Sequence, residues 1–389
     1  MKSISTHRIF FLGAGFSQPA GLPLGTELFR LVRNRVSARY GSDNHVERDL
    51  RDFKLYLKRC YGRSIDSDEI DFEEFLGFLD VEHYMRLRGK DTWSEEGNEA
   101  QLMMRVAIAE VLYDRTPRGA KIPDVYRRFV RGLTTTDLIW TFNYDTLLER
   151  ALELEGVPYR LFPLRFSEVH PLSSVVDRSS EKEVVLLKLH GSVDWFSRSS
   201  FDRSVATVKS APYLYPPNHE PKDPLFGKNA TIIAVPITEG PRPETEGLKN
   251  LYRVKELESA LSQPFWKCSP FILAPSSMKL FYAEPLLEFW RGLQNAGGLH
   301  LSLCIIGYSL PKYDEYAMQA IYHVARNYQY FEPNLQHRGR KKTKVRIVDF
   351  QSTRKGITGF RRRYRFLNWR RTEARFDGFN NESADWLLR

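Results

Sequence analysis

Glycines and polar side chains that could hold a nucleotide follow short apolar runs at several points in the sequence. These runs indicate buried β-strands, because they are short and are bounded by glycine or polar residues. In an open parallel sheet, ligands bind beyond the carboxyl ends of the strands. The candidate site residues stand at such ends: Gly13, Ala14, Gly15 and Ser17, then Asn143 and Asp145, His190, Gly307 and Ser309, and Asp349.

The first cluster contains a pair of glycines. Gly13 and Gly15 permit a tight turn and the close approach of a pyrophosphate, and a helix N-terminus after them would face the negative charge. The usual dinucleotide fingerprint has a third glycine, where this chain has Gln18. The pair alone is therefore also compatible with an ordinary strand-to-helix turn.

Two of these side chains could take part in catalysis. The amide of Asn143 suits a water molecule or a ribose hydroxyl, and the imidazole of His190 can accept a proton near neutral pH. The ordinary alternatives are a helix cap for Asn143 and packing under the Gly191 turn for His190.

Other polar groups could bind the rest of a nucleotide. The hydroxyls of Ser17 and Ser309 suit a phosphate or a ribose, and a local hydrogen bond to the backbone is the alternative for each. Asp349 ends the last expected strand, where a carboxylate could hold the adenosine ribose or simply be a solvated loop acid. Asp145 could cap the helix expected after it.

Alternating strands and helices are expected to position these groups. The expected strands cover 8–12, 137–142, 184–189, 271–274, 299–306 and 345–349. The expected helices cover about 26–38, a segment after 145, about 280–293 and about 313–328. This order predicts an α/β fold with a Rossmann-like, mostly parallel sheet and helices on both faces.

The remaining segments suggest one domain with an insertion. Apolar residues in 41–135 recur at three- and four-residue intervals, which predicts a helical insertion or layer. Residues 197–265 are rich in Pro, Ser and Lys, and we expect irregular structure there with a short strand at 231–235. Residues 338–389 are expected to complete the sheet. We therefore predict a single domain over 1–389.

Positive charge is concentrated near the C-terminus. The chain carries a net charge of +10, and residues 338–371 contain 14 Lys or Arg and one acid, which makes this region +13 and the remainder about −3. Such a region could contact nucleic acid, an acidic partner or another polyanion, or could be a solvated face. Its interleaved rings suit single-stranded nucleic acid: Phe360, Tyr364, Phe366 and Trp369. Alternatively, Tyr364 and the segment from Phe366 to Trp369 could form a strand that packs inward with its arginines outward.

The other composition signals exclude several classes of protein. Three widely spaced cysteines, Cys60, Cys268 and Cys304, cannot form a disulfide framework or a cysteine-rich zinc ribbon, and they favour a reducing, cytoplasmic setting. The histidines are scattered, so we expect no metal site. No stretch approaches the roughly 20 apolar residues that cross a bilayer, so we expect no membrane contact.

Four of the clusters, in their order along the chain, resemble the motifs of sirtuins. Residues 13–23 resemble the cofactor motif, Gly-Ala-Gly-x-Ser followed by Ala-Gly-Ile-Pro, and residues 141–145 resemble Thr-Gln-Asn-x-Asp with Phe142 in place of Gln. Residues 189–192 and 307–310 resemble the catalytic His-Gly element and the Gly-Thr-Ser-Leu element. The resemblance implies NAD binding, with Asn143 and His190 as catalytic residues and Asp145 near the carboxamide of nicotinamide.

The chain also departs from the sirtuin deacylases. Those enzymes carry two Cys-x-x-Cys pairs after the histidine, and this chain has none. Their Asp-Phe-Arg after Ile-Pro is replaced by Leu24, Gly25 and Thr26. Chains with this motif set, a helical insertion and no zinc ribbon look like the sirtuin-like NADases of bacterial antiphage defence. The resemblance implies an NAD hydrolase without zinc, often in a homo-oligomer or beside a partner such as a DNA-translocating ATPase.

Two other functions stay open on the sequence alone. One is a sirtuin-type deacylase or ADP-ribosyltransferase, against which the missing zinc ribbon counts. The other is a nucleotide-sensing or nucleic-acid-binding subunit of a defence complex, which the basic region 338–371 favours. A homo-oligomer is further suggested by the apolar content of 41–135, where four apolar residues stand beside Phe78: Phe72, Phe75, Leu76 and Leu79.

Overall fold

A computed structural model of the 389-residue chain gives the arrangement of its helices and strands. It describes residues 7–66, 69–88, 94, 96–161, 183–210, 221–237, 246–273, 282–283, 286–287, 290, 296–337 and 339–389.

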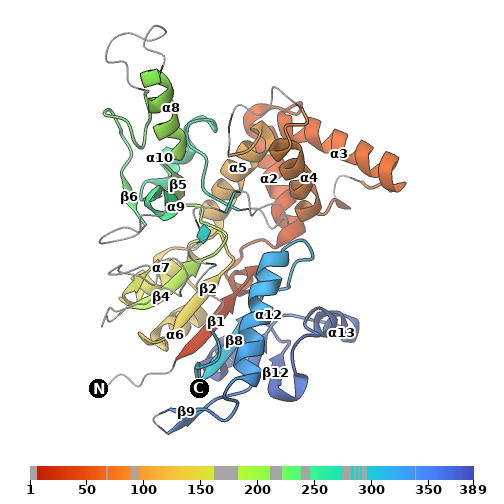
Figure 1. Cartoon of the computed structure of the whole chain (residues 1–389), viewed down its shortest axis with the longest axis vertical. Helices are drawn as coiled ribbons and strands as arrows, with labels where there is room; N and C mark the ends of the chain where they lie inside the picture. Colours follow the sequence, from red (N-terminus) through yellow and green to blue (C-terminus); the bar gives the residue numbers. More distant parts are fainter. Residues whose placement is uncertain are drawn as a thin grey trace.

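Seven parallel strands form the central sheet, in the order β12-β11-β8-β1-β2-β4-β3 (Figure 1). Their bounds are β1 Arg8–Leu12, β2 Leu138–Thr141, β3 Tyr159–Arg160, β4 Val184–Lys188, β8 Ser302–Ile306, β11 Val345–Val348 and β12 Thr372–Arg375. The central strands β1, β4 and β8 are buried along their whole length, as expected of a parallel sheet that is covered on both faces. The predicted α/β fold with a parallel sheet is confirmed.

Helices cover both faces of the sheet. On one face α6 (Asp124–Arg131) packs against α7 (Leu147–Leu154) and α14 (Asn381–Leu388). On the other face lie α12 (Glu315–Tyr330) and α13 (Arg354–Arg363) (Figure 1). The two sets of helices make the fold doubly wound, because the chain leaves β1 toward β2 and β4 in one direction and continues from β8 toward β11 and β12 in the other.

Four long helices form a layer beyond the carboxyl ends of the strands, and we call them the helical layer (Figure 1). They are α2 (Gly25–Tyr40), α3 (His45–Tyr61), α4 (Phe72–Tyr84) and α5 (Glu99–Arg115). Rings at helical spacing pack inside the layer: the Phe29 and Phe72 rings lie 4.9 Å apart, and the Phe53 and Phe75 rings 5.4 Å.

The chain after the central strand β4 is more regular than expected. Strands β5 (Trp195–Ser197), β7 (Leu251–Val254) and β6 (Ala234–Pro236) form an antiparallel sheet. Helices α8 (Ser199–Ser210) and α9 (Glu246–Lys249) lie between its strands in the sequence, and α10 (Leu257–Leu261) follows β7. The prediction of irregular structure was therefore wrong for the described parts of 197–265, whereas the short strand expected at 231–235 overlaps β6. Pairing between strands so far apart in sequence leaves little local signal.

One expected core strand does not join the central sheet. In the described part of 271–274, Ile272 makes a single antiparallel bridge with Gly191, and the Leu273 N–H donates to the carbonyl of His190 at 2.9 Å. This apolar run covers the His190 segment, which is why it is buried without being a sheet strand. The helix expected near 280–293 lies largely outside the described residues.

Short elements complete the chain. They are α1 (Ala14–Ser17), the 3-10 turns Gln18–Ala20, Gly119–Lys121 and Trp369–Arg371, and the hairpin of β9 (Gln336–His337) and β10 (Arg340–Lys341). No helix in the described part of the chain is long and apolar enough to span a membrane.

Candidate active site

The first and fourth clusters meet where the sheet changes direction, between β1 and β8. The Gly15 N–H donates to the Gly307 carbonyl at 2.8 Å, and the Gly13 N–H donates to Ile306 at 2.9 Å. A Cβ on Gly15 would lie 2.7 Å from the Gly307 Cα, so the two backbones leave no room for a side chain. The glycines thus bring two strand ends into direct contact, a role that the sequence did not reveal.

The turn after β1 is short. The helix that follows Gly13 is only the four residues of α1, and a 3-10 turn continues to Ala20 before Gly21 adopts a left-handed φ of 85°. Ala14 is exposed at the tip of this turn, whereas Ser17 is buried. The long helix expected nearby begins only at Gly25, in the helical layer.

Three predicted site residues form one buried hydrogen-bond network. The Asn143 side-chain amide donates to the Gly13 carbonyl and to the Ser17 hydroxyl, both at 3.0 Å. The Ser17 hydroxyl donates to the Asp145 carboxylate at 2.9 Å. Asp145 also accepts from the Leu147 N–H at 3.0 Å, so it caps the start of α7 as well as holding Ser17. The capping role that the sequence offered for Asp145 fits this geometry, and its role toward the nicotinamide carboxamide stays a prediction.

A buried ion pair lies against the loop that contains Asn143 and Asp145. Lys188, on the strand that leads to His190, is fully buried and donates to the Asp145 carbonyl at 2.5 Å and to the Glu149 carboxylate at 2.8 Å. Burial raises the pKa of Glu149, and Lys188 partly offsets this rise. The pair therefore connects β4 to α7, and Lys188 also contacts the Asn143–Asp145 loop.

His190 lies against a buried carboxylate that the sequence analysis did not single out. Its Nε2 is 3.2 Å from the Asp314 Oδ2, and the Tyr308 hydroxyl donates to the same carboxylate at 2.8 Å. Asp314 is fully buried at the start of α12, yet its side chain makes no cap hydrogen bond there. An imidazole beside a buried carboxylate is a common arrangement for a general base, because the carboxylate orients the ring and stabilises its protonated form.

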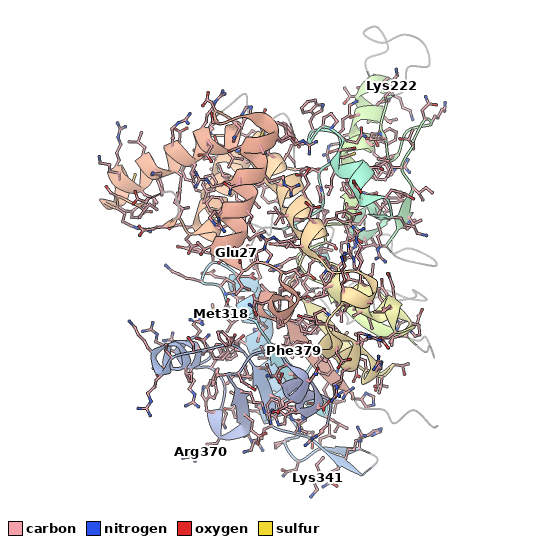
Figure 2. All side chains as sticks on the ribbon, turned by 180° about the vertical axis from the view of Figure 1, so that it is seen from behind. Glu27, Lys222, Met318, Lys341, Arg370 and Phe379 are labelled. Carbon is pink, nitrogen blue, oxygen red and sulfur yellow. The ribbon has the colours of Figure 1, made fainter. Side chains whose placement is uncertain are left out.

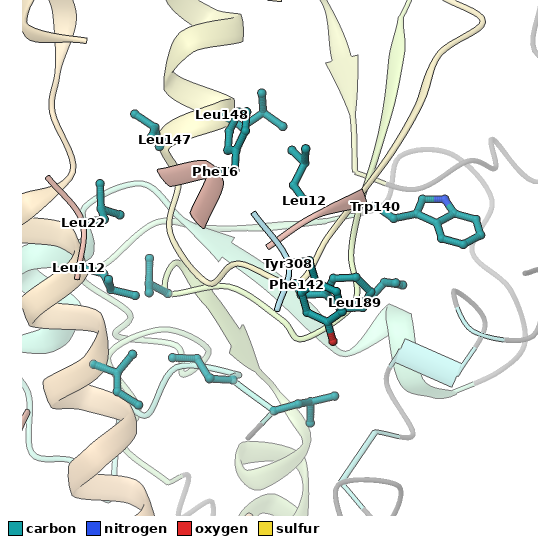
Figure 3. Close-up of a cluster of buried hydrophobic side chains, with 14 of the residues drawn as sticks. Leu12, Phe16, Leu22, Leu112, Trp140, Phe142, Leu147, Leu148, Leu189 and Tyr308 are labelled. Carbon is teal, nitrogen blue, oxygen red and sulfur yellow. The ribbon is translucent and has the colours of Figure 1, made fainter. Parts of the chain in front are cut away.

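Aromatic rings surround the imidazole. The Phe142 ring stacks on Tyr308, with 4.3 Å between centroids, and its edge meets His190 at 5.1 Å. Figure 3 shows Phe142 and Tyr308 together beside Leu189, at the point where the strands end. Burial, and secondarily the nearby Asp314, raises the pKa of the Tyr308 hydroxyl well above its usual value, so it stays a donor. The site is therefore apolar around a few fixed polar groups.

Two predicted residues lie apart from this network. Ser309 is exposed, and its carbonyl accepts from the Arg363 guanidinium at 2.7 Å. The Asp349 carboxylate accepts from the Phe350 N–H at 2.7 Å, and burial raises its pKa. Both residues lie toward α13, on the opposite side of the Gly15–Gly307 contact from Asn143. They mark a second part of the candidate site.

Among the described residues, no group of three or more His, Cys, Asp or Glu side chains gathers as a metal site would. The polar groups of the site instead suit work on an organic ligand. Asn143 and Ser17 can hold a hydroxyl or a water molecule, Asp145 can accept from an amide, and His190 can take up a proton with Asp314 behind it.

The sequence contains weak signals for two site residues that the sequence analysis did not single out, Lys188 and Asp314. Lys188 interrupts a run of buried apolar residues, and a charge in such a strand generally has a partner. Asp314 precedes a periodic helix and therefore resembles an ordinary N-cap.

Comparison with known proteins agrees with this site. Residues 137–220 match the family model described as the SIR2-like domain. This segment of the chain is similar to SIR2-like domains. The matched segment contains Asn143, Asp145 and His190, and the Gly13–Ser17 and Gly307–Ser309 clusters lie outside it. No curated protein matches the chain. A SIR2-like domain implies NAD binding and NAD-related activity.

Proposed function

We propose that this protein is an NAD glycohydrolase, which cleaves the bond between nicotinamide and ribose with water. One observation carries the proposal: the buried Asn143–Ser17–Asp145 network lies next to a His190–Asp314 pair, at the strand ends of a SIR2-like domain. These groups can hold a ribose and accept a proton.

In the proposed reaction the bond between ribose C1′ and the pyridinium nitrogen breaks, and its electron pair leaves with nicotinamide. The ribose then carries oxocarbenium-like positive charge, as in glycoside hydrolysis. A water oxygen bonds to C1′ and loses a proton, so the products are nicotinamide, ADP-ribose and H⁺. Asn143 would hold the water or a ribose hydroxyl, and His190 would accept the proton while Asp314 stabilises the imidazolium.

We also propose which residues bind the other parts of NAD. Asp145 would bind the carboxamide of nicotinamide, and the backbone at Gly13, Ala14 and Gly15 would lie along the pyrophosphate, with Ser17 and Gly307 beside it. The adenosine ribose would lie toward two further residues, Ser309 and Asp349. The Gly15–Gly307 contact lies between the two groups of residues, so NAD would extend across this contact.

The decisive experiment incubates the purified chain with NAD and measures free nicotinamide and ADP-ribose. We expect both products in equal amounts without any acyl-lysine peptide. Release of nicotinamide only with such a peptide would indicate a deacylase instead, and transfer of ADP-ribose to protein would indicate a transferase.

A first prediction concerns Asn143. Replacing it with Ala should lower NAD turnover by about a hundredfold or more, since one positioned polar group at a reacting centre is worth that much. Circular dichroism and the melting temperature should show that the variant is folded. Wild-type turnover by folded Asn143→Ala would contradict the assignment.

We further propose that the enzyme depletes NAD as a cytoplasmic effector of bacterial antiphage defence. The polar groups of the site are almost completely buried, with exposed fractions of 8% for Asn143, 7% for Asp145 and 3% for His190. Such a closed site suits an enzyme whose basal turnover is low and rises when it is triggered. A homo-oligomer or a partner ATPase of the DNA-translocase type would supply the trigger. Cells that carry the wild-type gene, but not Asn143→Ala, should lose NAD upon phage infection.

A further inference from the structure

The surface formed by α13 and the loop after it is unusual in its charges. Residues 354–371 contain eight cations and no acid, and we call this segment the basic face: Arg354, Lys355, Arg361, Arg362, Arg363, Arg365, Arg370 and Arg371. In the described structure none of the eight forms an ion pair. Many arginines of the helical layer are paired, for example Arg33 with Glu47 at 2.9 Å and Arg39 with Glu110 at 2.7 Å.

Some members of the basic face anchor it to the fold. Arg363 donates to the Ser309 carbonyl at 2.7 Å, Arg371 donates to the Gln329 carbonyl, and Arg361 lies over the Trp369 ring at 5.2 Å. The other five cations are exposed: Arg354, Lys355, Arg362, Arg365 and Arg370. Figure 1 shows α13 at the outer edge of the sheet, and Figure 2 shows Arg370 far from the helical layer. These contacts attach the basic face to the rest of the fold, and its exposed charges point outward.

The chemistry of the face favours a polymer of phosphates. Unpaired like charges repel one another, so a polyanion that neutralises them binds favourably and releases its counterions. All but one of the eight cations are arginines, whose planar fork matches phosphate oxygens. Partly exposed rings lie among them, since Tyr322 contacts Phe366 at 5.9 Å beside Arg365, and Trp369 lies under Arg361. Bases of a single strand stack on such rings.

We propose that the basic face is a docking surface for single-stranded nucleic acid. The phosphates bind the exposed arginines, and the bases lie against the rings. Arg363 places the surface next to Ser309, at the edge of the candidate NAD site. This inference does not depend on NAD hydrolysis, because it is tested by binding alone.

The test measures binding of a fluorescent oligothymidylate of about 20 nucleotides, longer than most single-strand sites. Fluorescence anisotropy of the full chain is recorded over a range of salt concentrations. The triple variant Arg362→Glu, Arg365→Glu, Arg370→Glu should bind more weakly. Since each phosphate contact adds about −0.7 to the slope of log K against log salt for single strands, its slope should flatten by about two.

A matched variant controls for net charge. Arg30→Glu, Lys58→Glu, Arg59→Glu makes the same charge change at exposed cations of the helical layer and should bind like the wild type. Equal weakening in both variants, at unchanged melting temperatures, would overturn the proposal. Equally tight binding of a DNA duplex would overturn the preference for single strands. Equally effective competition by polyglutamate at matched charge would show that an acidic protein fits as well, and would overturn the nucleic-acid assignment.

Discussion

His190 and Asp314 show how single residues here depend on buried partners. Asp314 has no contact with solvent, and the Tyr308 hydroxyl and the His190 ring both lie within hydrogen-bonding distance of one of its oxygens. A buried carboxylate is costly unless it is hydrogen-bonded or paired, so these contacts keep it in place. We interpret Asp314 as a positioning residue that orients His190, and not as a group that touches NAD.

The second prediction tests this role. Asp314→Asn keeps the size of the side chain but removes its charge, so the imidazolium loses its counter-charge. NAD turnover should fall by roughly two orders of magnitude, as it should in His190→Ala, because general base catalysis is worth about that much. NAD affinity, measured by calorimetry, should change little.

The pH dependence of turnover separates this positioning role from a purely structural one. If Asp314 positions His190, the acid limb of the pH–rate profile of Asp314→Asn should move to lower pH, since a protonated His190 is no longer favoured by a neighbouring charge. Tyr308→Phe removes only the hydroxyl and should have a smaller effect. A lowered melting temperature with parallel loss of affinity and turnover, and an unmoved pH profile, would refute the assignment.

The third prediction concerns the buried pair of Lys188 and Glu149. Lys188→Met leaves the Glu149 carboxylate buried without its cation, and should lower the free energy of unfolding by about 3–5 kcal/mol. The double variant Lys188→Met, Glu149→Leu removes both charges and should recover much of that loss. Urea denaturation measures both. If the double variant were as unstable as the single one, the pair would not be the source of the effect.

At the scale of elements, the contact between the turns after β1 and β8 holds the two halves of the sheet together. Gly307 has a left-handed φ of 59°, and a Cβ there would lie 2.3 Å from the Gly15 carbonyl carbon. Backbone atoms cannot easily move away, unlike the end of a flexible side chain. The turn therefore requires glycine for its conformation and for its packing.

The fourth prediction separates these two requirements. Gly156 also has a left-handed φ, of 63°, but has open space around it. Gly156→Ala should cost about 1 kcal/mol from backbone strain alone. Gly307→Ala should cost clearly more, above about 2 kcal/mol, because the new methyl group also collides with the Gly15 backbone. Thermal denaturation that shows equal losses would mean that the turn can relax.

The elements that the sequence predicted are those with a strong local signal. The central strands were foreseeable because strands buried on both faces are short, continuous apolar runs. Strand β12 was missed because Thr372–Arg375 is a polar edge strand, and β5 and β7 were missed because distant segments pair. Strand β6 overlaps the short strand that was expected at 231–235. The apolar run at 271–273 was misassigned because burial under the His190 segment leaves the same pattern as burial in a sheet.

The candidate site was predictable to a similar extent. The positions at strand ends and the sirtuin-like motifs together pointed to Asn143, Asp145 and His190, and the structure brings Asn143 and Asp145 together through Ser17. Asp314 was not predictable, because its contact with His190 joins residues more than a hundred positions apart. Only the fold determines such a pair.

At the scale of the whole molecule, charge is divided between two regions. Cations of the helical layer are largely neutralised by nearby acids, whereas the basic face is not. Two such regions on one rigid framework can serve different partners, for example another subunit and a polyanion.

The last prediction concerns self-association through the helical layer. The four apolar residues that suggested an oligomer, Phe72, Phe75, Leu76 and Leu79, are buried inside this chain and so give no support. A different apolar group remains at the end of α4, where Val81, Tyr84, Met85 and Leu87 have exposed fractions of 39–65%. Adjacent exposed apolar side chains are typical of contact surfaces between subunits.

We therefore expect the protein to form an oligomer at micromolar concentration, as measured by light scattering. Met85→Glu, Leu87→Glu should shift it toward the monomer, because burying two carboxylates in an apolar contact is unfavourable. Ile233→Glu, Trp266→Glu changes equally exposed apolar residues outside the helical layer and should leave the mass unchanged. A monomeric wild-type chain would contradict the prediction. An oligomer that persists in the Met85 and Leu87 variant would place the contact elsewhere on the molecule, away from the end of α4.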